Sequence, residues 1–73
     1  MKAILESTSK MVTMNGVPAR IWEGVSDGGV PFLAFITRVA VKLDADNSQF
    51  EKELQETKSP SAEAQAYPLR MIL

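Results

Sequence analysis

The chain has no cysteine and no histidine among its 73 residues. Without Cys there can be no disulfide, no thiolate zinc site and no cysteine nucleophile. Without His the chain lacks the commonest metal ligand and the side chain best suited to acid–base catalysis near neutral pH. We therefore predict that the protein is not an enzyme, and that it has no catalytic residue, no cofactor site and no metal site. No small-molecule substrate is indicated.

Long apolar runs are missing too, and so is any cluster of basic residues. No run approaches the ~20 apolar residues that span a bilayer, and the first ten residues lack the apolar region of a signal peptide. These features predict a cytoplasmic protein that does not enter a membrane. The formal net charge is −1 and most acidic residues lie in the second half. This distribution argues against binding of nucleic acid through its phosphates.

The short length predicts a single domain, residues 1–73, in which residues 1–10 form a loosely ordered extension. A chain of this size buries only about 60% of the surface that it exposes when unfolded. Its core then supplies only about 3 to 5 kcal/mol, and small domains usually add a disulfide, a metal or a second subunit. Because the first two are excluded, self-association is the reinforcement that remains.

Turn residues divide the first 43 residues into three β-prone runs. Asn15-Gly16 is the dipeptide that best fits a two-residue type I′ turn, and it predicts a hairpin between residues 10–14 and 17–25. Ser26-Asp27-Gly28-Gly29 is the next turn, and residues 30–43 then read as a long third strand. Together they predict an antiparallel meander.

The pattern changes to helical after residue 43. Ser48 and Glu51 have the spacing of a capping box, so we expect a helix over residues 49–57 that ends before Pro60. The apolar residues from Tyr67 to Leu73 indicate a last edge strand or extended tail. The predicted fold is α+β, a three-stranded antiparallel meander followed by one short helix and a C-terminal strand or tail (β-β-β-α-β).

Strand alternation predicts two apolar faces, if the second loop has an even length. We expect the main core on the face of Trp22, which the helix would cover with Phe50 and Leu54. The second face would then lack an internal cover and expose more apolar surface than monomers usually do. The expected members of the main core stripe are Trp22, Leu33, Phe35, Thr37, Val39, Val41 and Leu43.

Two alternatives remain for covering the second face. The chain itself could cover it, in a small barrel or through Ala3 to Leu5, or a second copy of the chain could do so. We favour a homodimer because the rim of this face carries charges of both signs, which a two-fold axis can pair. The predicted dimer or partner interface comprises Val17, Ala19, Ile21, Glu23, Phe32, Ala34, Ile36 and Arg38.

Two short motifs suggest ligand sites but fail in detail. The run from Asp44 to Glu51 resembles the start of a calcium loop, yet Gln49 and Gln55 stand where that loop needs Gly and Glu. Capping of a helix explains the same residues. The run Ser26 to Gly29 joins two strands rather than a strand and a helix, so it reads as a hairpin turn and not as a phosphate cradle.

Taken together, the sequence predicts a small accessory or interaction protein, of a composition typical of bacterial or phage proteins. It would act as a homodimer that binds another macromolecule, with an acidic helix surface of Glu51, Glu53 and Glu56 facing a protein partner. The alternative is a small β-sheet protein that binds single-stranded nucleic acid on its aromatic side chains. The expected faces place Trp22, Phe35 and Arg20 on one side and Phe32 and Arg38 on the other, and this division of the aromatic and basic residues weakens the alternative.

Overall fold

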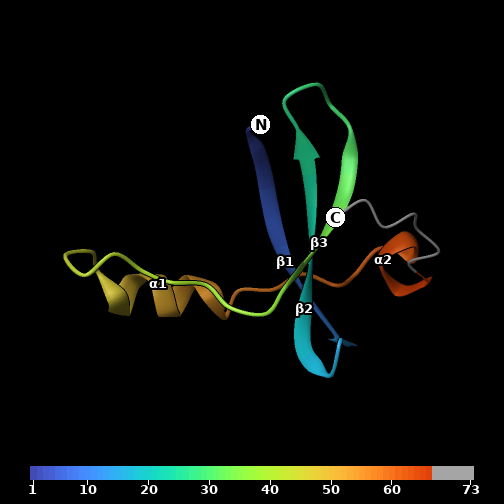
Figure 1. Cartoon of the computed structure of the whole chain (residues 1–73). Helices are drawn as coiled ribbons and strands as arrows, with labels where there is room; N and C mark the ends of the chain where they lie inside the picture. The colour runs from blue at the N-terminus through green and yellow to red at the C-terminus, as the bar shows by residue number, and fades with distance from the viewer. Residues whose placement is uncertain (67–73) are drawn as a thin grey trace.

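The computed structural model describes residues 1–66, which form a three-stranded antiparallel sheet and two short helices (Figure 1). The predicted meander followed by a helix is confirmed, whereas the predicted C-terminal strand or tail lies outside the described residues. A second short helix was not expected. The elements are β1 (Ala3–Met14), β2 (Val17–Ser26), β3 (Pro31–Ile36), α1 (Asn47–Leu54) and α2 (Ala62–Ala66), and the strand order is β1-β2-β3.

The first hairpin is longer than the sequence suggested. Asn15 and Gly16 have positive φ angles of 53° and 81°, as a type I′ turn requires, and Met14 pairs with Val17 across them. The pairing continues to Ala3 opposite Ser26. The prediction that residues 1–10 are a loose extension was therefore wrong, because the ten residues of β2 offer a ladder along which this polar segment can pair.

The loop between β2 and β3 has an odd number of residues, and this overturns the predicted faces. Ser26 donates its backbone N–H to the carbonyl of Val30 at 3.0 Å, which leaves three residues at the tip, and Gly29 has a φ of 81°. Val25 pairs with Pro31 and Trp22 pairs with Ala34. A shift of one residue in register moves every side chain of a strand to the other face. Consequently Phe32, Ala34 and Ile36 share a face with Trp22, while Leu33 and Phe35 lie on the opposite one.

β3 ends at Ile36, so the predicted strand over residues 30–43 was too long. In an antiparallel ladder hydrogen-bonded pairs alternate with non-bonded pairs. Ser26 and Val30 form a hydrogen-bonded pair, so every second pair after them is also hydrogen-bonded, as far as Arg20 and Ile36. The next hydrogen-bonded pair would need the N–H of residue 18. Residue 18 is Pro, which has no N–H. The chain leaves the sheet at this point, and residues 37–43 form no strand.

The register defines two faces of the sheet. Directly opposed residues project to the same side, and alternate residues project to opposite sides. The Trp22 face carries Ala3, Leu5, Ser7, Met11, Thr13, Pro18, Arg20, Trp22, Gly24, Phe32, Ala34 and Ile36, and the Ile21 face carries Ile4, Glu6, Val12, Met14, Val17, Ala19, Ile21, Glu23, Val25, Pro31, Leu33 and Phe35.

Helix α1 begins two residues earlier than predicted and uses a different cap. The side chain of Asp46 accepts a hydrogen bond from the backbone N–H of Gln49 at 3.0 Å, and Ser48 donates its hydroxyl to the same carboxylate at 2.8 Å. The predicted capping box of Ser48 and Glu51 was therefore wrong. A carboxylate at this position also interacts favourably with the positive end of the helix dipole.

The two helices lie on opposite sides of the sheet (Figure 1). Residues 60–64 cover the Ile21 face, where Ile21 and Ala64 are fully buried and Ala19 is nearly so. This small cluster is the closed part of the core, and burying a side chain such as Ile21 is worth about 1.5 to 3 kcal/mol. α1 lies on the side of Trp22 and has no buried residue.

The molecule is open for its size. Its radius of gyration is 13.2 Å, against about 11 Å for a compact domain of this length. Residues 37–55, which include α1 and which we call the arm, extend away from the sheet and account for the elongated outline in Figure 1.

Candidate functional site

The arm is held to the sheet by residues 56–61, which we call the strap. β1 contains a bulge between Ser7 and Met11, where three residues lie opposite Ile21. The strap crosses the edge of β1 at this bulge. Lys58 donates its backbone N–H to the carbonyl of Ser7 and accepts from the N–H of Ser9, at 3.1 and 3.0 Å, forming a short parallel bridge with β1. The strap thus carries the chain from the Trp22 face to the Ile21 face.

Thr8 closes the bulge from inside. It is fully buried, and its hydroxyl donates to the carbonyl of Ile21 at 2.7 Å and accepts from the N–H of Lys10 at 3.2 Å. The guanidinium of Arg20 donates to the carbonyl of Thr8 at 2.8 Å. These bonds replace the ladder bonds that the bulge interrupts, so backbone groups at the crossing point keep their partners.

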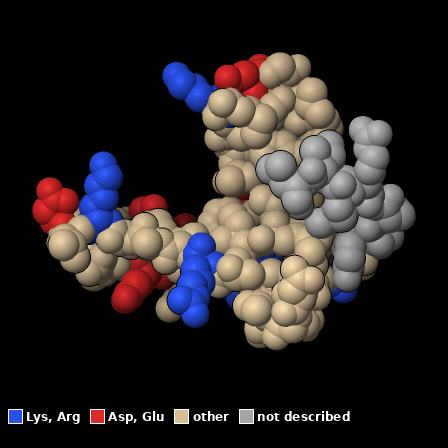
Figure 2. Space-filling view, viewed as in Figure 1, with Lys and Arg blue, Asp and Glu red and all other residues tan. Residues whose placement is uncertain are grey.

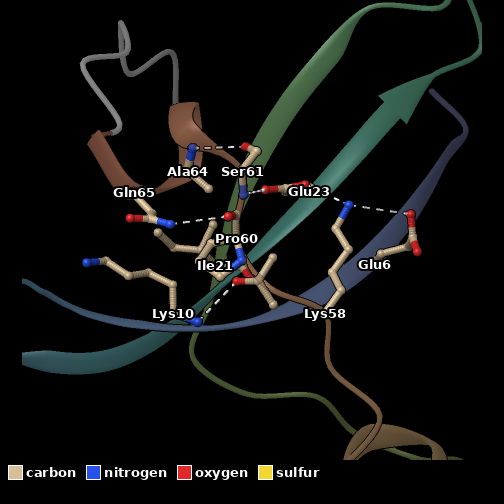
Figure 3. Close-up of polar contacts among 10 residues, drawn as sticks. Glu6, Lys10, Ile21, Glu23, Lys58, Pro60, Ser61, Ala64 and Gln65 are labelled. Carbon is tan, nitrogen blue, oxygen red and sulfur yellow. Dashed lines mark hydrogen bonds and ion pairs between the residues drawn. The ribbon is translucent and has the colours of Figure 1, made fainter.

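The side chain of Lys58 lies between two carboxylates (Figure 3). Glu6 and Glu23 stand directly opposite each other on neighbouring strands, an arrangement that is unfavourable for like charges. The Nζ of Lys58 lies 2.7 Å from Oε1 of Glu23 and 3.7 Å from Oε1 of Glu6. The cation of the strap therefore compensates a repulsion that the sheet register creates.

Glu23 also anchors the residues that follow Lys58. Its Oε2 accepts the backbone N–H of Ser61 at 2.7 Å, and the Ser61 hydroxyl in turn accepts the N–H of Ala64, at the start of α2. The ion pair with Lys58, together with the hydrogen bonds from Ser61, lowers the pKa of Glu23 from 4.5 to about 2. The hydrogen bond with Glu23 in turn raises the pKa of Lys58. This cluster is a structural tether, since its single cation, Lys58, contacts both carboxylates.

Two grooves open between the arm and the Trp22 face, and Trp22 and Leu54 contribute to both. The first, the Leu5 groove, has a volume of about 500 Å³, and the second, the Ile36 groove, about 610 Å³. Figure 2 shows a deep hollow between the arm and the sheet. The walls of the Leu5 groove include Leu5, Trp22, Phe50 and Leu54, and those of the Ile36 groove include Met11, Trp22, Ile36, Val39 and Leu54.

Gly24 shapes the end of the Trp22 face beside the Leu5 groove. A Cβ at this position would lie 2.5 Å from a methyl carbon of Leu5 and 2.7 Å from the ring of Phe32. The absence of a side chain lets Leu5 and Phe32 close over the strand. Leu5 nevertheless remains 38% exposed, and Met11 on the same face is 49% exposed. The apolar surface of this face is therefore only partly covered.

The structure divides the predicted dimer interface between the two faces. Val17, Ala19, Ile21 and Glu23 lie on the Ile21 face, and Phe32, Ala34 and Ile36 on the Trp22 face. Their placement on one surface was wrong, because the loop length was misjudged. Ala19 and Ile21 are buried within the single chain, on the face that residues 60–64 cover. Arg38 lies in the arm, at the Ile36 groove.

The acidic residues predicted to face a partner are all exposed. Glu51 and Glu53 lie in α1, whereas Glu56 follows the helix and belongs to the strap. Glu53 and Glu56 border the Leu5 groove and Glu51 borders the Ile36 groove. These carboxylates therefore surround the apolar walls and do not form one separate surface.

Within residues 1–66, no group of three or more potential metal-ligating side chains comes together, and no helix is long and apolar enough to cross a membrane. No protein-family model, curated protein or solved structure matches the chain.

The sequence reasoning missed Leu5, Met11, Thr8 and Lys58. A signal for the first two was present, because Leu5 and Met11 are the large apolar residues of a segment with strong β-formers, and pairing would place them on a face. The roles of Thr8 and Lys58 depend on a bulge and on a contact between distant segments. No local pattern indicates either of these features.

Proposed function

We propose that the chain is a small non-enzymatic interaction protein that acts as a homodimer through its Trp22 face and binds another macromolecule. The observation that supports this most directly is the partly covered Trp22 face, where apolar side chains of the sheet and the arm line two open grooves. A standard interface buries about 800 Å² per partner, and the exposed or half-buried apolar residues Leu5, Met11 and Val39 border these grooves.

The test compares two exposed apolar residues on opposite faces. Met11 and Val25 are both 49% exposed; Met11 lies on the Trp22 face and Val25 on the Ile21 face. We expect the unaltered chain and Val25→Lys to have the molar mass of a dimer by light scattering at micromolar concentration, and Met11→Lys to be a folded monomer. A monomeric unaltered chain, or a dimer that only Val25→Lys disrupts, would contradict the proposal.

The acidic side chains around the grooves suit a basic protein partner. Glu53 and Glu56 are exposed and belong to the arm and the strap. We expect a pull-down from the native host to recover fewer partners with a Glu53→Lys, Glu56→Lys variant than with the unaltered chain. Recovery of the same partners in the same amounts would exclude these carboxylates from partner binding.

Single-stranded nucleic acid is a second candidate ligand, and one observation favours it. The Ile36 groove brings Trp22, Arg20 and Arg38 together, although Arg38 was expected on the face opposite Trp22 and Arg20. Bases stack on aromatic rings beside cations. Glu51 borders the same groove and Arg20 is bound to the Thr8 carbonyl, which reduces the positive charge available. Saturable, salt-sensitive quenching of Trp22 fluorescence by oligonucleotides would favour nucleic acid over a basic protein as the partner.

A further inference from the structure

The arm carries apolar residues that its own sheet does not cover. Leu43 is fully exposed and Val39 is 44% exposed. Both precede α1, an eight-residue helix with no buried residue. An isolated helix of this length is only marginally stable in water. Much of the apolar surface of the arm is therefore left unpacked within one chain.

The contacts of α1 are concentrated at its C-terminal end. Leu54 lines both grooves beside Trp22, and Phe50 lines the Leu5 groove. Residues 43–48 line neither groove. In Figure 1 this part of the chain projects away from the sheet. The arm thus reaches past its own Trp22 face and ends in solvent with Leu43 uncovered.

The charges of the arm and of the Ile36 groove are complementary. Asp44 and Asp46 flank the tip of the arm close to Leu43, and both are exposed. Arg20, Arg38 and Glu51 border the Ile36 groove, and since Arg20 is bound to the Thr8 carbonyl, Arg38 is the cation that can pair with these carboxylates. An apolar side chain flanked by carboxylates fits an apolar groove bordered by guanidinium groups.

We infer that the arms are exchanged in the homodimer: the tip of each arm, residues 43–46, occupies the Ile36 groove of the other copy. This inference rests on the proposed homodimer and adds which segment fills the grooves. A two-fold axis beside Trp22 makes the contact reciprocal, because the same segment and the same groove are present in both copies. Exchange of an identical element between copies is a common route to small dimers.

A fluorescence experiment separates exchange from simple association, because Trp22 is the only Trp and the chain has no Cys. One chain carries Trp22→Phe and Ala45→Cys with a nitroxide quencher on the thiol, and it is mixed in excess with the unaltered chain. Any quenching must then come from the other copy. We expect most of the Trp22 emission to be lost. As a control, the quencher is placed on Asp27→Cys in the exposed turn between β2 and β3, where we expect little loss.

The result distinguishes the two levels of the proposal. A dimeric molar mass without quenching from position 45 would show that each arm stays on its own sheet, and would overturn the exchange alone. A monomeric mass would overturn the homodimer and the exchange with it. Equal quenching from positions 45 and 27 would also contradict the exchange, since it would show that the tip of the arm lies no closer to Trp22 of the other copy than the β2–β3 turn does.

A second pair of variants tests the apolar contact directly. Leu43 and Val30 are both highly exposed in the single chain, so neither substitution by Asp should prevent folding. We expect Leu43→Asp to weaken the dimer at least about tenfold, because the buried side chain is lost from the interface. Val30→Asp should leave the dissociation constant unchanged. Equal dissociation constants for the two variants would exclude Leu43 from the interface.

Discussion

The carboxylate of Glu23 lies 2.7 Å from the Nζ of Lys58, and this ion pair joins the central strand of the sheet to the strap. Glu23 is held on two sides, because its other oxygen accepts the N–H of Ser61. The strap is the connection between the arm on one side of the sheet and α2 on the other (Figure 3). The position of the arm therefore depends on a polar contact at the edge of β1 as well as on apolar packing.

Removing the charge of Glu23 should loosen this connection. We expect Glu23→Gln to lower the free energy of unfolding by about 1 to 2 kcal/mol, because Lys58 loses its nearest carboxylate while solvent screening limits the effect. Urea denaturation measures the change. Glu51→Gln, at an exposed position of α1, serves as the control and should leave the stability nearly unaltered. Equal effects of the two substitutions would contradict the role of Glu23.

The same carboxylate should make the stability dependent on acid pH. The pKa of Glu23 is lowered from 4.5 to about 2 by its bonds with Lys58 and Ser61. Folding therefore favours the charged form. The stabilisation is fully present above pH 4.5 and is lost as the pH falls through about 2. We expect denaturation midpoints to fall across this interval, and to fall less in Glu23→Gln. Identical pH profiles of the two chains would assign the acid dependence to other groups.

Thr8 provides a test of the bulge. Thr8→Val keeps the shape of the side chain but removes the hydroxyl that binds the Ile21 carbonyl and the Lys10 N–H. We expect a loss of about 1 to 3 kcal/mol in unfolding free energy, the usual effect of leaving a buried polar group without its bond. Thr8→Ser retains the hydroxyl and should lose less. A larger loss of stability in Thr8→Ser than in Thr8→Val would show that the methyl group, and not the hydrogen bonds of the hydroxyl, stabilises this site.

The meander could be predicted because its signals are local. Asn15-Gly16 fixes the first hairpin, and acidic and hydroxyl residues mark the start of α1 to within two residues. The faces could not be predicted with the same security, because Ser26 to Gly29 is compatible with loops of even or odd length. That one-residue difference decides whether Trp22 shares its face with Phe32 or with Leu33.

Other features depend on contacts between distant segments. Ala3–Met14 forms a strand because β2 supplies a long partner, not because the polar residues Ser7, Thr8 and Ser9 favour one by themselves. Pro18 is a local indication of where β3 ends. Once the register is known, its missing N–H predicts the last residue that can pair with β2. The strap contact of Lys58 follows from the bulge and has no sequence pattern of its own.

The homodimer makes a further prediction about Phe50. Phe50 is only partly buried in the single chain and lines the Leu5 groove, so its packing should be completed by the second copy. The melting temperature of a dimer rises with protein concentration, because association stabilises the folded state. We expect this dependence in the unaltered chain and a weaker one in Phe50→Ala.

The control is Leu33→Ala, at a partly buried position on the Ile21 face. It should lower the melting temperature and keep the dependence of that temperature on concentration. Differential scanning calorimetry over a hundredfold range, about 1 to 100 μM, measures both effects. Melting temperatures that do not change with concentration in the unaltered chain would show that Phe50 packs within a monomer.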